Sequence, residues 1–268
     1  MIRLSANKRS IIYSLIATLS FYLIIDAKSL NSFILAITVN MILILIEIYS
    51  LKLVSINKLQ QLNLPIVNIY PKYLEYFYHS LIPALLLISF STFVYFNPVT
   101  LFIPFILILF FLVISILYIN LRAYLEDKFQ IEISTHFIYA FAIFFAFFSL
   151  TNTVLNLASL HSLPLLIVTM FLLVIYILLY AGIFIENLDI NIKLLVLSFV
   201  SSVLLTIVAG ILFEYYSSIL RTSFITTIIF YFTVALTHHK SEGTLSFGII
   251  VEYVAITALS LTMLYGIQ

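Results

Sequence analysis

The chain has 268 residues, of which 64% are hydrophobic and only 9% are charged, whereas soluble domains average about 25% charged residues. This composition excludes a soluble globular protein and indicates an integral membrane protein. Twelve basic against eleven acidic residues give a net charge of +1, so nucleic-acid binding through an excess of positive charge is excluded. Because cysteine is absent, disulfides, thiolate metal sites and cysteine nucleophiles are excluded as well.

Uncharged runs of about 20 residues, the length that crosses the hydrocarbon core of a bilayer, recur along the whole chain. They predict an all-α fold, a polytopic transmembrane helical bundle of about nine spans. In chain order, the predicted helices cover 11–26, 30–51, 75–96, 99–120, 136–158, 163–185, 193–214, 219–237 and 245–266. The first run follows basic residues, as in a signal peptide, but Ile25-Asp26-Ala27 is not a small-x-small cleavage site. We therefore expect this helix to be retained.

The distribution of Lys and Arg predicts the orientation of the bundle. With a cytoplasmic N-terminus, ten of the twelve basic residues fall in internal segments, and only Lys28 and Arg221 are external. This asymmetry follows the positive-inside rule, so we expect a multi-pass protein of the cytoplasmic cell membrane. No polar segment is long enough for a soluble domain, and residues 1–268 are predicted to form a single membrane domain. The stretches near 52–64 and 121–134 are interpreted as helices on the membrane surface.

Small and polar residues at helical spacing predict which helix faces pack together, because they allow close approach and hydrogen bonds within the bilayer. On the seventh predicted helix, the helix-packing stripe consists of Ser198, Ser202, Thr206 and Gly210, each four residues apart. Similar stripes mark the second, fifth and ninth predicted helices. We expect these four helices to form the core. The fourth and sixth predicted helices are apolar all round and are expected to face lipid.

Glu252 is the strongest candidate for a functional side chain, because an ionisable group inside a span is costly unless it has a partner or reaches water. It lies about seven residues into the last predicted helix, on the same side as Gly248, Ala255 and Thr262. Its carboxyl group is expected to be protonated, paired or in contact with a water-filled cavity. A structural carboxyl group without a function is the alternative.

Three further polar residues fall in the same, internal leaflet. Glu47 lies near the internal end of the second predicted helix, and Asn40 lies two turns earlier on the same face. His79 lies four residues before Pro83, which cannot donate a hydrogen bond to the His79 carbonyl and so predicts a kink. With Glu252, these residues are the candidates for binding a substrate or a proton. Alternatively, Glu47 reaches the membrane interface or pairs with a nearby lysine.

The internal turn around His238, His239 and Glu242 holds the densest group of residue types that bind metals. A zinc site normally requires three or four protein ligands, and this turn offers two on one helix face. We therefore interpret it as an exposed basic turn, and we expect neither a metal nor a cofactor.

The sequence contains no GxxxxGK[ST], GxSxG or HExxH motif, which removes the corresponding nucleotide-binding, serine-hydrolase and zinc-protease arrangements. Three hypotheses remain. The first is a permease-like or lipid-handling bundle, in which Glu252, helped by Glu47 and His79, binds a proton, a cation or a polar headgroup. The second is a non-catalytic membrane subunit that docks a partner protein. The third is an intramembrane enzyme that uses His79 and Glu252 on a lipid phosphate. The expected partners are thus the lipid bilayer and either a small solute, a lipid ligand or a membrane protein.

Overall fold

The computed structural model describes residues 2–27, 29–61, 84–96, 103–125, 132–185, 192–215, 218–241 and 243–266. Within these ranges every regular element is an α-helix, and there is no strand. Each predicted span coincides with a helix or, for the third, with a shorter helical segment. The prediction of an all-helical bundle is therefore confirmed.

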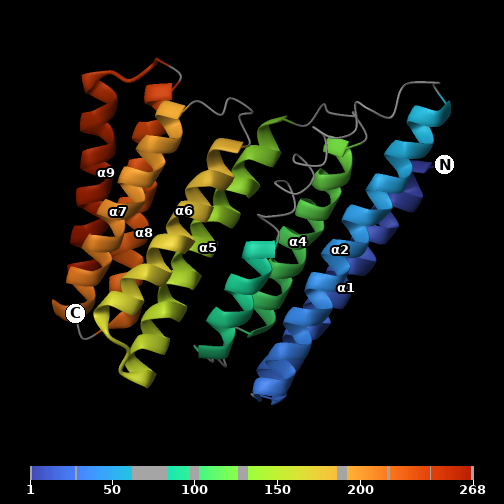
Figure 1. Cartoon of the computed structure of the whole chain (residues 1–268), viewed down its shortest axis with the longest axis horizontal. Coiled ribbons are helices and arrows are strands. Elements are labelled where there is room, and N and C mark those ends of the chain that lie inside the picture. The colour runs from blue at the N-terminus through green and yellow to red at the C-terminus, as the bar shows by residue number, and fades with distance from the viewer. Residues whose placement is uncertain are drawn as a thin grey trace. The chain divides into compact units, whose positions relative to one another are not determined.

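The helices contain the apolar runs of the sequence, and α1, α2 and α5 extend beyond them (Figure 1). They are α1 (Ile2–Ala27), α2 (Leu30–Gln61), α4 (Ile103–Leu125), α5 (Glu132–His161), α6 (Leu165–Ile185), α7 (Ile192–Tyr215), α8 (Ile219–Ser241) and α9 (Phe247–Gly266), with a further helical segment Ala84–Phe96. Four stretches are long and apolar enough to cross a membrane, namely Ser10–Ala27, Ala140–His161, Val196–Tyr215 and Ile219–Lys240. These helices indicate a membrane protein. The number of nine spans and their orientation stay predictions.

The chain divides into two compact units, Met1–Ile143 and Phe144–Gln268, and the division falls inside α5. In the first unit, α1 packs against both α2 and α4. The ring of Phe21 in α1 lies 4.1 Å from that of Phe110 in α4 and 5.2 Å from that of Phe90, between centroids. Edge-to-face aromatic contacts of this kind, rather than small residues alone, hold the first unit together.

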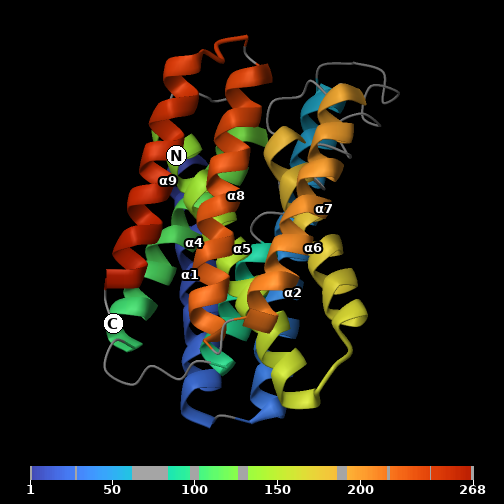
Figure 2. The same ribbon diagram turned by 90° about the vertical axis from the view of Figure 1, so that its left-hand side faces the viewer.

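In the second unit, α7 packs against α6 and α8, and α8 packs against α9, as the neighbouring ribbons in Figure 2 show. Its centre is a stack of three rings from three helices. Phe147 of α5 lies between Tyr176 of α6, at 4.4 Å, and Phe230 of α8, at 4.0 Å, and Tyr180 meets Phe230 edge-on at 5.0 Å. Because lipid is as apolar as these side chains, close packing rather than transfer from water stabilises the contact.

Two helical hairpins of the second unit are set by residues with left-handed backbone conformation. At the α5–α6 turn, Ser162 has a φ angle of 48°, and Pro164 directly precedes α6. At the α8–α9 turn, Gly243 has a φ angle of 69°, and the Thr244 amide donates to the His239 carbonyl at 3.0 Å. Such a residue ends a helix and satisfies its last carbonyls. The local sequence therefore makes α5 and α6, and likewise α8 and α9, adjacent along short turns.

The predicted division into core and lipid-facing helices is wrong for α9 and incomplete for α4 and α6, which each expose one apolar side and bury another. The two helices expected to face lipid each bury large aromatic side chains: Phe110 and Tyr118 of α4, and Tyr176 and Tyr180 of α6, are at most 1% exposed. The helix α9, expected in the core, exposes most of its surface. The prediction considered only small and polar stripes, and aromatic packing decides these contacts instead.

The two stretches interpreted as surface helices continue the neighbouring long helices where they are described. The helix α2 runs without a break to Gln61, α4 runs to Leu125, and α5 begins at Glu132. The remaining residues of the two stretches, 62–64 and 126–131, lie outside the described residues. Their placement on the membrane surface stays a prediction.

Candidate functional site

Asn40 lies buried between α2 and α1, with only 1% of its surface exposed. Its side-chain Nδ2 donates to Ser20 Oγ of α1 at 2.7 Å and to the Ala36 carbonyl of its own helix at 2.7 Å. Ser20 Oγ in turn donates to the Ala17 carbonyl at 2.7 Å. Two donor hydrogens of the amide are therefore used, and they fix its orientation.

The Oδ1 atom of Asn40 is buried and accepts no hydrogen bond. Buried polar atoms are nearly always paired, so this acceptor is suited to a molecule that donates a hydrogen bond. A second such acceptor, Ser115 Oγ, lies buried on α4. Both acceptors therefore belong to helices that pack against α1 in the first unit.

The other internal-leaflet candidates cannot be placed beside Asn40. Glu47 belongs to α2, two turns further along, but its side chain lies outside the described residues, and His79 with Pro83 falls in the range 62–83, also outside them. The convergence of Glu47, His79 and Asn40 on one site therefore stays a prediction.

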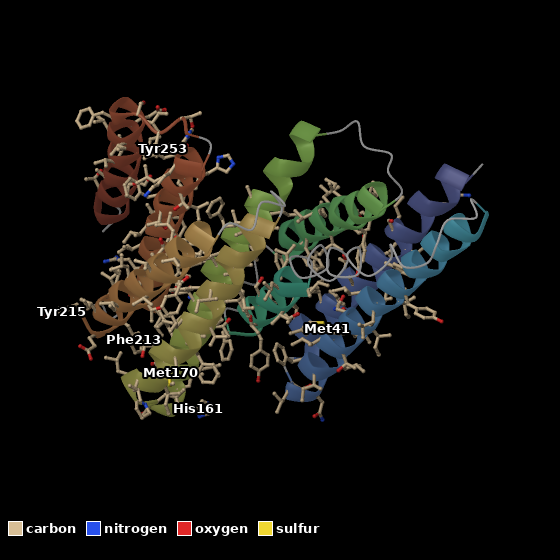
Figure 3. The ribbon with its side chains drawn as sticks, turned by 45° about the horizontal axis from the view of Figure 1, so that its top comes forward. Met41, His161, Met170, Phe213, Tyr215 and Tyr253 are labelled. Atoms are coloured by element: carbon tan, nitrogen blue, oxygen red, sulfur yellow. The ribbon has the colours of Figure 1, made fainter. Side chains whose placement is uncertain are left out.

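Glu252 does not face the interior of the second unit. Its side chain is exposed, as are Gly248, Ala255 and Thr262 on the same side of α9. The opposite side carries Tyr253, whose ring lies 6.0 Å from that of Tyr231 and 5.8 Å from that of His239, both in α8 (Figure 3). The expectation that the small-residue side of this helix points inward is wrong.

A second stripe on α9 explains its orientation. Tyr253, Thr257 and Ser260 follow one another at helical spacing and are all partly buried. Tyr253 also shares a side-chain hydrogen bond with Tyr231. This stripe is present in the sequence, but its first member is an aromatic residue, so a pattern of small residues alone does not include it.

The helix-packing stripe of α7 is buried throughout. Ser202 Oγ donates to the Ser198 carbonyl at 2.8 Å, and Thr206 Oγ1 donates to the Ser202 carbonyl at 2.8 Å. A Cβ atom added at Gly210 would lie 3.5 Å from Thr169 Cγ2 of α6, so the two helices approach closely there. The hydroxyl groups of Ser202 and Thr206 therefore donate within their own helix, and the packing role of the stripe stays a prediction.

A hydroxyl network that sequence reasoning missed joins the helices of the second unit. The Tyr176 hydroxyl shares a hydrogen bond with Thr151 Oγ1 of α5 at 3.1 Å. The Tyr180 hydroxyl shares one with Thr233 Oγ1 of α8 and another with Ser201 of α7. The only signal for it in the sequence was the presence of two tyrosines within an otherwise apolar span.

The described interior is electrically neutral apart from backbone dipoles. Its buried polar side chains are those of Ser, Thr, Asn and Tyr, and no described Asp, Glu, Lys, Arg or His is buried. Among the described residues, no group of three or more His, Cys, Asp or Glu side chains can hold a metal ion. In the basic turn, His239 Nδ1 shares a hydrogen bond with Thr244 Oγ1 at 2.9 Å. The described geometry therefore offers hydrogen-bonding groups in the interior and a single carboxyl group on the exposed side of α9.

The chain matches no protein-family model, no curated protein and no solved structure.

Proposed function

We propose that this chain is a membrane-embedded, non-catalytic subunit that docks a second membrane protein through the exposed side of α9. The observation that carries the proposal is the position of Glu252, an acidic side chain exposed on an apolar helix. A carboxyl group that faces lipid costs a few kcal/mol of insertion free energy, so such residues usually face protein or water. A partner helix against α9 removes this cost.

The residues around Glu252 suit a helix contact. Gly248 and Ala255 flank it on the same side of α9, about one turn away in each direction. Small residues at this spacing allow two helix backbones to approach closely in a bilayer, where packing and hydrogen bonds replace the hydrophobic effect.

Native mass spectrometry of the chain extracted from its own membrane in mild detergent tests the proposal. We expect a complex of fixed stoichiometry with another membrane protein. The complex should be lost when Ala255→Trp fills the small-residue side, and kept when Val254→Trp places the same bulk elsewhere on α9, where Val254 is 49% exposed. A parent chain that carries no protein partner, or an Ala255→Trp variant that keeps its partner, contradicts the proposal.

The second candidate function is the permease-like or lipid-handling bundle, and the unpartnered Asn40 Oδ1 favours it. A solute or headgroup that donates a hydrogen bond would occupy this acceptor. The matched variants are Asn40→Leu and Thr38→Val, because Thr38 is exposed on the same helix and bonds only its own turn, to the Ile34 carbonyl at 2.8 Å. A bound molecule lost only in Asn40→Leu supports this function, and equal binding in both variants contradicts it. No described residue favours the third hypothesis, the intramembrane enzyme.

A further inference from the structure

The outer face of α9, defined here as Gly248, Glu252, Ala255, Leu259 and Thr262, is exposed along its whole described length. These residues recur at spacings of three and four and so share one side of the helix. Tyr253, which contacts α8, points to the opposite side. No described residue forms an ion pair with Glu252.

We propose that the partner supplies a transmembrane helix with a cationic side chain, Lys, Arg or protonated His, that pairs with Glu252. This inference rests on the proposed function and names the chemistry of the docked helix. Charge complementarity carries it: the outer face holds one acidic group and otherwise only small, apolar or hydroxyl side chains. A cation opposite the carboxyl group both removes it from lipid and fixes the depth at which the two helices meet.

The position of Glu252 along α9 favours a helix partner. It is the sixth residue of α9, which begins at Phe247, so it lies about 8 Å along the helix at 1.5 Å per residue. Neighbouring exposed residues, such as Val251 at 50% and Leu259 at 58%, are apolar. Long Lys and Arg side chains reach the interface from such a depth, whereas the shorter Glu side chain is less able to do so. We therefore expect a long basic side chain of the partner to extend toward Glu252.

A second copy of the chain is less suited to cover the outer face than a helix of another protein. All copies insert with the same orientation, so a two-fold contact between outer faces would place two Glu252 side chains opposite each other at one depth. Like charges at such a distance repel, and more strongly in a medium of low dielectric constant. His239 of α8 does not remove this conflict, because its ring contacts Thr244 and Tyr253 and not the outer face. A helix of another protein avoids the conflict.

Site-directed photocross-linking in native membranes tests the inference, and the absence of cysteine from the chain makes each introduced cysteine unique. Ala255→Cys on the outer face is labelled with a thiol-reactive benzophenone, and Val254→Cys, exposed on another side, is the matched control. We expect an adduct from Ala255→Cys at a yield at least tenfold above that of Val254→Cys. Peptide mass spectrometry should place it on a transmembrane helix of another protein, within one turn of a Lys, Arg or His.

Charge reversal then identifies the role of the cation. In the Ala255→Cys background, Glu252→Lys should lower the adduct yield at least tenfold, and Glu252→Gln should lower it less. When an acidic residue replaces the partner's cation, the yield with Glu252→Lys should be restored. If Glu252→Lys does not accumulate in the membrane, Glu252→Gln is combined instead with a neutral residue in place of the partner's cation. The double variant should then lower the adduct yield by less than the two single changes together.

The outcomes separate the two proposals. An adduct to a helix of another protein without a nearby cation, or one insensitive to charge reversal, overturns the cationic partner but leaves docking intact. An adduct with a second copy overturns the inference, and an adduct with residues 1–143 of the same chain shows that the chain itself covers the outer face. Equal yields from Ala255→Cys and Val254→Cys overturn docking and the inference together.

Discussion

The helices α7 and α9 both carry a stripe of small residues, but the stripe of α7 is buried and that of α9 is exposed. On α7, Ser198, Ser202, Thr206 and Gly210 are all buried. On α9, Gly248, Ala255 and Thr262 are all exposed, and so is Glu252 among them. A small-residue stripe therefore marks a surface suited to close helix contact, but it does not specify which helix, or which protein, makes that contact.

The difference lies in what the remaining sides of the two helices can bind. The aromatic side chains beside α9 belong to α8 and contact Tyr253, so the aromatic side of α9 is the one that packs within the chain. The stripe of α7 instead meets α6, where the Gly210 position approaches Thr169. Substitutions at matched buried and exposed positions test whether the two helices differ in this way.

Phe147→Ala should destabilise the chain most, by about 3 kcal/mol in free energy of unfolding, because the ring is fully buried between Tyr176 and Phe230. Phe171→Ala, on the exposed side of α6 at 57% exposure, should change that free energy by less than about 0.5 kcal/mol. Unfolding by denaturant in detergent micelles, followed by circular dichroism, measures both. Equal losses would mean that the exposed side of α6 is also packed against protein.

Gly210→Leu and Gly248→Leu compare the two stripes directly. At Gly210 a larger side chain enters the contact with Thr169 of α6 and should cost about 2 kcal/mol through overpacking. At Gly248 the nearest atom to an added Cβ is Ser246 Oγ at 3.9 Å, so the stability of the isolated chain should change by less than about 0.5 kcal/mol. The same Gly248→Leu variant should lose the partner complex. If it destabilises the isolated chain as much as Gly210→Leu does, the outer face is packed within the chain.

The fold class could be predicted from the sequence because hydrophobic length sets both the membrane class and the helices. The turns at Ser162-Leu163-Pro164 and Gly243 also depend on the local sequence, through residues with a left-handed backbone conformation. Which side of each helix packs was not predictable from stripes alone. Tyr176, Tyr180 and Phe147 decide the interior of the second unit through aromatic stacking, and a pattern search for small residues assigns such helices to lipid.

The sequence could identify the candidate residues but not the side chains and helices that surround them. Asn40 was chosen because it shares a helix face with Glu47, and its pairing with Ser20 of α1 depends on a contact between helices that no single-helix pattern contains. Glu252 was chosen from the cost of a carboxyl group in lipid. The cost is the same whether the group faces the interior or a partner, so the sequence could not distinguish the two, and the structure places it on the exposed side.

Tyr180→Phe should cost about 1 kcal/mol, because it removes a hydroxyl that bonds Thr233 and Ser201 on two other helices, and intramembrane hydrogen bonds are of this size. Tyr22→Phe, at 50% exposure on α1, should change the free energy of unfolding by less than about 0.3 kcal/mol. The difference between the two variants, measured in the same detergent, isolates the buried hydroxyl. No difference would mean that the network contributes to specificity of packing and not to stability.

Asn40→Leu should have the smallest effect, a change within about 1 kcal/mol and of either sign. The substitution removes the bond to Ser20 Oγ, but that hydroxyl still donates to the Ala17 carbonyl. It also removes Asn40 Oδ1, an acceptor that is buried without a partner. No polar group is therefore newly orphaned, and a leucine of similar volume fills the place. Unfolding with and without native lipids measures the change. A loss above about 2 kcal/mol only when lipids are present would mean that a bound molecule donates to Asn40 Oδ1, and would favour the permease-like or lipid-handling function over docking through α9.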